Sequence, residues 1–114
     1  MSLLSAIHAI LRPVGIPVET GLFSDKAPDE YVVVIPLTEN YDYFADNLPQ
    51  VDVHEARISI FTKGNYLGIK NAVVKAFLAA EFTVTNRQYI GYEADTGYHH
   101  YNVDVANYYE TEEI

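Results

Sequence analysis

The sequence contains no cysteine and no tryptophan, and it has only seven lysine and arginine residues against sixteen aspartate and glutamate residues. Without cysteine, the 114-residue chain forms no disulfide, no thiolate metal site and no thiol nucleophile. The net charge of −9 argues against general binding to nucleic acids or to anionic membranes, because both need a cationic protein surface. These absences exclude several classes of enzyme and of nucleic-acid-binding protein.

Long apolar runs are also lacking. No stretch approaches the roughly 20 residues that cross a bilayer, and the N-terminal residues lack the basic region of a signal peptide. Hydrophobic residues nevertheless make up 49% of the chain, which is enough to form a core. We therefore expect one soluble, acidic domain over residues 1–114 in a cytoplasm-like compartment, with a frayed acidic tail at about 110–114.

Hydrophobic periodicity predicts six elements. A helix capped by Ser2 ends before Pro13, and a second helix covers residues 66–80. Strands are expected at residues 31–37, 51–63, 82–92 and 98–109, and the connector at 13–30 has room for a short extended piece at 16–18. This order, α-β-β-α-β-β, predicts an α+β fold with about four strands in a mainly antiparallel sheet and the helices packed on one face.

Two features of the strands need a local explanation. Pro36 cannot donate a hydrogen bond to a neighbouring strand, so it is expected at a sheet edge or a bulge. The apolar positions of residues 51–63 change from odd to even numbers, which predicts either a β-bulge within this segment or two short strands. Residues 39–50 follow neither period, and we interpret them as an exposed acidic and aromatic loop.

The tripeptide Asp95-Thr96-Gly97 also occurs in aspartic proteases, where two such aspartates share a proton. Only 17 residues follow Gly97, too few for the rest of such an enzyme, and Glu93-Ala94 replaces the apolar strand that would precede the motif. Gly97 readily takes a positive φ. We therefore interpret this segment as the turn of a β-hairpin.

The four histidines are candidate metal ligands. His99 and His100 are adjacent on a strand and point to opposite faces, so they cannot easily share one ion. Surface or interface roles are therefore favoured over a metal site that these histidines would form with His54-Glu55 or with His8. The sequence has neither a phosphate-binding glycine loop nor a Gly-x-Ser-x-Gly elbow. We predict no catalytic residue, no metal ligand and no cofactor, and we do not expect an enzyme.

Tyrosine is the unusual feature of the composition, with ten copies, six of them after residue 85. Alternation along strands directs about half of these side chains away from the core, and exposed tyrosine is enriched at interfaces. Packing within the sheet and contact with another subunit are equally well supported, and the second helix carries apolar residues beyond a single stripe. The candidate subunit or partner contacts are Tyr41, Tyr43, Phe44, Leu67, Val74, Leu78, Tyr89, Tyr92, Tyr98, His99 and Tyr108.

Over residues 2–109 the chain resembles the small tail-completion, or tail-terminator, proteins that join tail to head in long-tailed phages. The resemblance rests on the first helix ending in proline, Tyr31-Val-Val-Val-Ile35, Glu55-Ala-Arg-Ile-Ser-Ile-Phe61, the Lys63-Gly-Asn helix opening and Asp95-Thr-Gly-Tyr-His-His-Tyr101. The segment from Asp95 to His100 is its strongest part. The connector at 19–30 departs from the family pattern, and residues 39–50 do not align with it.

The resemblance implies a ring of six subunits at the end of the tail tube, in contact with the tail-tube protein and with a head-tail connector protein. Such a ring stops tube growth, belongs to the virion and is assembled in the host cytoplasm. DNA would pass through it without specific binding, because like charges repel. Two alternatives stay open: another connector such as a head-closure protein, and a small cytoplasmic ligand-binding α+β domain.

Overall fold

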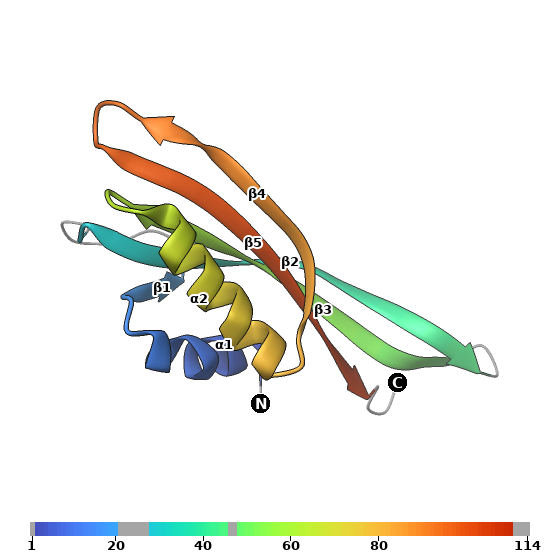
Figure 1. Cartoon of the computed structure of the whole chain (residues 1–114). Coiled ribbons are helices and arrows are strands. Elements are labelled where there is room, and N and C mark those ends of the chain that lie inside the picture. The colour runs from blue at the N-terminus through green and yellow to red at the C-terminus, as the bar shows by residue number, and fades with distance from the viewer. Residues whose placement is uncertain (1, 21–27, 46–47, 111–114) are drawn as a thin grey trace.

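The computed structural model of the chain describes residues 2–20, 28–45 and 48–110 (Figure 1). In chain order the elements are α1 (Leu3–Leu11), the short 3-10 helix η1 (Arg12–Val14), β1 (Val18–Thr20), β2 (Glu30–Ala45), β3 (Leu48–Thr62), α2 (Tyr66–Ala79), β4 (Thr83–Glu93) and β5 (Tyr98–Glu110). The fold is α+β, as the sequence predicts. Its order is α-β-β-β-α-β-β, however, with five strands rather than about four.

The five strands form one sheet in the order β1-β2-β3-β5-β4. All neighbouring pairs are antiparallel except β1 and β2, which are parallel. The additional strand, β1, lies in the connector at 13–30 and begins at Val18, the last residue of the extended piece expected at 16–18. It is only three residues long, so its sequence carries too few positions to display a period.

Both helices begin at the residues that the sequence predicts. The N–H of Ser5 donates to Ser2 Oγ over 3.1 Å, and the N–H of Leu67 donates to Asn65 Oδ1 over 3.0 Å. Each bond satisfies a backbone donor that has no partner within its helix. α1 ends at Leu11, two residues before Pro13, and α2 ends one residue before its expected limit.

The core lies between these helices and one face of the sheet, which we call the inner face (Figure 1). Its buried members are Leu3, Ile7, Leu11, Val32, Val34, Ala56, Ile58, Ile60, Val73, Phe77, Phe82, Val103 and Val105. Burial of each large apolar side chain contributes about 1.5–3 kcal/mol. Among the described residues, neither helix is long and apolar enough to span a membrane.

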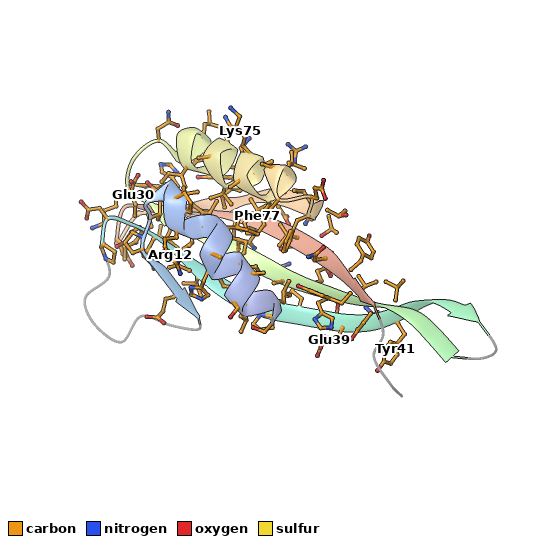
Figure 2. All side chains as sticks on the ribbon, turned by 90° about the horizontal axis from the view of Figure 1, so that it is seen from below. Arg12, Glu30, Glu39, Tyr41, Lys75 and Phe77 are labelled. Atoms are coloured by element: carbon orange, nitrogen blue, oxygen red, sulfur yellow. The ribbon has the colours of Figure 1, made fainter. Side chains whose placement is uncertain are left out.

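The interpretation of residues 39–50 as a loop is wrong. β2 and β3 remain paired through this segment, from Glu39 opposite His54 to Ala45 opposite Leu48. The paired strands extend beyond both helices, and the molecule measures 54 × 26 × 24 Å (Figures 1 and 2). Neither helix covers this part of the hairpin (Figure 1), so its strands need not alternate apolar and polar residues to pack against a helix, and the sequence shows no strand period here.

The bulge lies on the neighbouring strand rather than within residues 51–63. The register of β2 against β3 shifts between Pro36 and Thr38, which leaves Leu37 as an extra residue, whereas β3 pairs with β5 without interruption from Val51 to Thr62. The position of Pro36 at a bulge is confirmed. Val51 and Val53 keep the phase of β3 and belong to the outer face, the side of the sheet away from the helices.

Candidate assembly surfaces

The tripeptide Asp95-Thr96-Gly97 belongs to the turn between β4 and β5, as the sequence predicts. Gly97 has a φ of 83°, and its N–H donates to the carbonyl oxygen of Glu93 over 2.7 Å. The turn brings β4 back against β5, with Glu93 opposite Tyr98. It therefore aligns the tyrosines of the two strands.

A tyrosine cluster joins the first turn of α2 to β4 and β5. The ring centroid of Tyr66 lies 4.8 Å from that of Tyr89 and 5.3 Å from that of His99. The Tyr89 hydroxyl lies 3.0 Å from His99 Nδ1, and the Tyr92 ring lies 4.8 Å from the His99 ring. His99 is thus packed among several aromatic rings, and these contacts hold the first turn of α2 on the sheet.

Part of this end of the molecule remains apolar and exposed. We call it the turn-end patch: Leu67, Tyr89, Ile90 and Tyr92, with 40–56% of each residue accessible to solvent. Ile90 lies at a register shift of β4, between Tyr89 and Gly91, so it departs from the strand alternation. Ile90 was not among the predicted contacts, although Gly91 directly after it is the kind of glycine within a strand that often marks a β-bulge.

Two further exposed tyrosines lie at the stem of the hairpin, where β2 and β3 leave the helices. These stem tyrosines are Tyr41 on β2, 54% exposed, and Tyr108 on β5, 50% exposed. The strand register places them on opposite faces of the sheet. Tyr108 lies nine positions after His99 along β5, about 30 Å at the usual rise of a strand, so the stem and the turn-end patch are far apart.

The outer face of the sheet is polar near its centre and aromatic near the turn end. Arg57 binds Asp104 through two hydrogen bonds of 2.9 and 3.1 Å, and Ser59 Oγ donates to Asn102 Oδ1 over 2.9 Å. The Phe61 ring stacks on Tyr31 at 4.9 Å and on His100 at 4.3 Å. Tyr98 also contacts this stack, and its hydroxyl donates to the carbonyl oxygen of Pro28.

The residues predicted as contacts therefore have different environments. Tyr41, Leu67, Leu78, Tyr89, Tyr92 and Tyr108 are exposed and available to a partner. Val74 is half-buried against the core, Tyr98 is only 8% exposed, and His99 belongs to the tyrosine cluster. Tyr43 and Phe44 lie in β2, but their side chains are outside the described part of the structure.

The structure also forms a cavity of about 320 Å³ between the first turn of α1 and the hairpin stem. It is lined by Ser2, Leu3, Leu4, Pro36, Leu37, Thr38, Glu39, His54, Glu55 and Tyr109. The carboxylates of Glu39 and Asp52 both lie close to His54 at its edge. Sequence reasoning missed this cluster because it depends on the pairing of β2 with β3, although the spacing of Asp52 and His54 already places both on one face of a strand.

The histidines do not come together. His54 pairs with Asn107 of β5, seven residues along that strand from His100, which corresponds to about 23 Å. A site shared by His54 with His99 or His100 is therefore excluded by the register.

No protein-family model and no curated protein matches this chain. Among solved structures, it is similar to a chain of the "Virion of native gene transfer agent (GTA) particle", with a TM-score of 0.60, 15% sequence identity and coverage of 96% of each chain. The two chains share a fold. Because the coverage is nearly complete in both directions, the likeness includes both helices and the long hairpin as well as the central sheet.

Proposed function

We propose that this chain is a structural virion protein, and specifically a tail-completion subunit that caps the tail tube as a ring and joins the tail to the head. The observation that carries the proposal is the shared fold, over 96% of both chains, with a chain of a gene transfer agent virion. The family resemblance in the sequence supports the same role through different features, the turn at Asp95–His100 above all.

Two separate exposed surfaces support assembly into a ring. A ring with head-to-tail contacts needs two different, complementary patches on each subunit, placed apart so that each subunit meets two neighbours. The turn-end patch and the stem tyrosines supply two such places, about 30 Å apart along β5. We propose that a second copy of this chain covers them, and the resemblance sets the expected number of copies at six.

The hairpin stem and the charge of the chain suit a position beside the DNA path. Glu39, Asp52 and Glu55 lie on the stem or next to it, and the chain carries a net charge of −9. A negative surface repels the phosphates of DNA and keeps its passage free of tight binding. We propose that the projecting hairpin faces the lumen or docks on the tail-tube protein.

The decisive experiment assembles tail tubes from the tail-tube protein with and without this chain, followed by electron microscopy. With the wild-type chain we expect tubes of limited length that attach to heads, and without it overlong tubes that do not attach. A Tyr41→Ser variant tests the hairpin, and Asn71→Ser, on an exposed face of α2, is the matched control. Equal tube lengths and equal head attachment with and without the chain would contradict the proposal.

The second candidate is a ligand-binding domain, and the cavity at the hairpin stem is the observation that favours it. A head-closure protein differs from a tail-completion protein in its partner, which is the head connector and not the tail tube. Capture of the head connector without any binding to tail tubes would indicate head closure. Tight binding of a small molecule by a chain that associates with neither partner would indicate a ligand-binding domain.

A further inference from the structure

We propose that Glu39, Asp52 and His54 form a binding site for one divalent transition-metal ion at the stem of the hairpin. Their ligand atoms, a carboxylate oxygen from each acid and a ring nitrogen of the histidine, all lie within 4.8 Å of one another. Imidazole and carboxylate together are a common ligand set for Zn²⁺. In Figure 2, Glu39 lies on β2 just beyond α1, with Tyr41 farther out along the stem.

Strand pairing explains why these three side chains converge. Glu39 is directly opposite His54 across the hairpin, and Asp52 precedes His54 by two residues on the same face of β3. The bulge at Leu37 is essential to this arrangement. If the pairing of Pro36 with Ala56 continued without an extra residue, Thr38 rather than Glu39 would face His54.

The angles at His54 Nε2, rather than its distances from the two carboxylates, argue against hydrogen bonds, because both distances lie within hydrogen-bond range. His54 Nε2 lies 3.2 Å from Glu39 Oε1 and 2.9 Å from Asp52 Oδ2. This nitrogen is nevertheless buried and has no hydrogen-bond partner of acceptable geometry among the described residues. Two ligands bound to Zn²⁺ at about 2.0–2.2 Å in a tetrahedron are roughly 3.3–3.6 Å apart, and each points to the ion rather than to the other.

A second buried polar atom without a partner belongs to a residue beside the proposed site. The hydroxyl of Tyr109 is buried and, within the described part of the chain, lacks a hydrogen-bond partner. Its residue is opposite Asp52 on β5, and its ring centroid lies 4.9 Å from that of His54. Buried polar atoms without partners are uncommon and often mark a missing ion or water. A water on the metal, held in the adjacent cavity, would give the Tyr109 hydroxyl its partner.

The ligand set also selects the type of ion. One imidazole and two carboxylates suit Zn²⁺, Co²⁺, Ni²⁺ or Mn²⁺, whereas Mg²⁺ prefers oxygen ligands alone and keeps most of its waters. An ion bound here connects β2 to β3 where the hairpin leaves the helical layer. It would therefore hold the projecting hairpin in one orientation.

The test is a titration of the untagged, metal-free chain with ZnCl₂ by calorimetry and with CoCl₂ by visible absorption. We expect one ion per chain and cobalt bands of the kind given by a low-coordinate site with a nitrogen ligand. His54→Gln and Asp52→Asn should each weaken binding at least about tenfold. His8→Gln on α1 is the matched control and should bind as the wild type does, and circular dichroism checks that every variant is folded.

Three results would overturn the proposal. The first is the absence of Zn²⁺ and Co²⁺ binding at millimolar concentration. The second is binding that survives both His54→Gln and Asp52→Asn, and the third is equal affinity for Mg²⁺ and Zn²⁺. Reduced hydrogen exchange at residues 39–45 and 48–54 on addition of Zn²⁺ would support the proposed effect on the hairpin.

Discussion

At the scale of single residues, the pair of Arg57 and Asp104 shows how charge is accommodated on the outer face. The Asp104 side chain is only 7% exposed, and Arg57 satisfies both of its oxygens. The hydrogen bonds to Asp104 raise the pKa of Arg57 above its ordinary value. The hydrogen bonds from Arg57 therefore replace the contacts with water that the Asp104 carboxylate loses on folding.

Replacement of that partner gives the first prediction. In Arg57→Met the carboxylate of Asp104 stays largely buried without its counter-ion, which should lower the free energy of unfolding by about 1–3 kcal/mol, because solvent at the half-exposed Arg57 limits the loss. The double variant Arg57→Met/Asp104→Leu removes both charges and should lose less than the single variant. Urea denaturation measures the free energy of unfolding of both variants. If Arg57→Met is as stable as the wild type, Asp104 does not depend on Arg57.

His100 gives a prediction of pH dependence. Burial lowers the pKa of His100 below its ordinary value of 6.5, with a hydrogen bond to Asn102 acting in the opposite direction. The unfolded chain therefore binds a proton more readily than the folded chain does. Stability from this group is complete above about pH 6.5 and is lost as the pH falls from there through the folded pKa.

Urea denaturation at several pH values measures this effect. The free energy of unfolding of the wild type should decrease from pH 7.5 to pH 5.5, and His100→Gln should reduce that decrease, because it removes the proton uptake on unfolding. Between pH 7.5 and 8.5, where this histidine is neutral in both states, His100→Gln should not alter the dependence on pH. If the free energy of unfolding of His100→Gln decreases below pH 7 as steeply as that of the wild type, the pH dependence comes from other groups.

At the scale of elements, two glycines with different backbones give the third prediction. Gly68 lies in the first turn of α2 with open space around it, so Gly68→Ala should stabilise the chain by about 0.5 kcal/mol. Gly97 has a φ of 83°, where an alanine side chain is strained, so Gly97→Ala should destabilise it by about 1–2 kcal/mol. Thermal unfolding of the two variants should show opposite shifts, and shifts of the same sign would contradict this account of the turn.

The elements also show what the sequence could and could not predict. Caps and an apolar stripe marked both helices, and the turn at Gly97 marked the β4–β5 hairpin, because these signals are local. The outer half of the β2–β3 hairpin was missed because its strands pair with each other beyond the helices, and this pairing leaves no apolar period in the sequence. The cluster at Glu39 and His54 was missed with it, since only the register and the bulge at Leu37 bring those residues together.

At the scale of the whole molecule, the elongated shape separates the two exposed apolar surfaces. The turn-end patch lies beside the β4–β5 turn, and the stem tyrosines lie where the hairpin leaves the helices, as Figure 2 shows for Tyr41. The sequence predicted several of these residues as contacts from composition and periodicity. It could not show that they divide into two places, because that division follows from the path of β5 through the sheet.

This division gives the fourth prediction. Tyr92→Ser and Tyr108→Ser each remove an exposed ring. The free energy of unfolding should change by no more than about 0.5 kcal/mol in Tyr108→Ser and by about 0.5–1.5 kcal/mol in Tyr92→Ser, because the Tyr92 ring also packs on His99. Each should nevertheless reduce head-to-tail joining at least about tenfold, because a closed ring needs both patches. Urea denaturation and counts of joined particles measure the two effects, and Asn71→Ser serves as the control. If both variants join heads to tails at wild-type levels, these tyrosines do not belong to the interface.

Imaging of the assembled particles tests the central claim most directly. Electron cryomicroscopy of particles that contain this chain should find it as one ring of six copies at the joint between tail tube and head. The turn-end patch of each subunit should face the neighbouring subunit, and the hairpins should point to the lumen or the tube. Copies distributed along the tail or over the head, or no copies in the particle, would contradict the account.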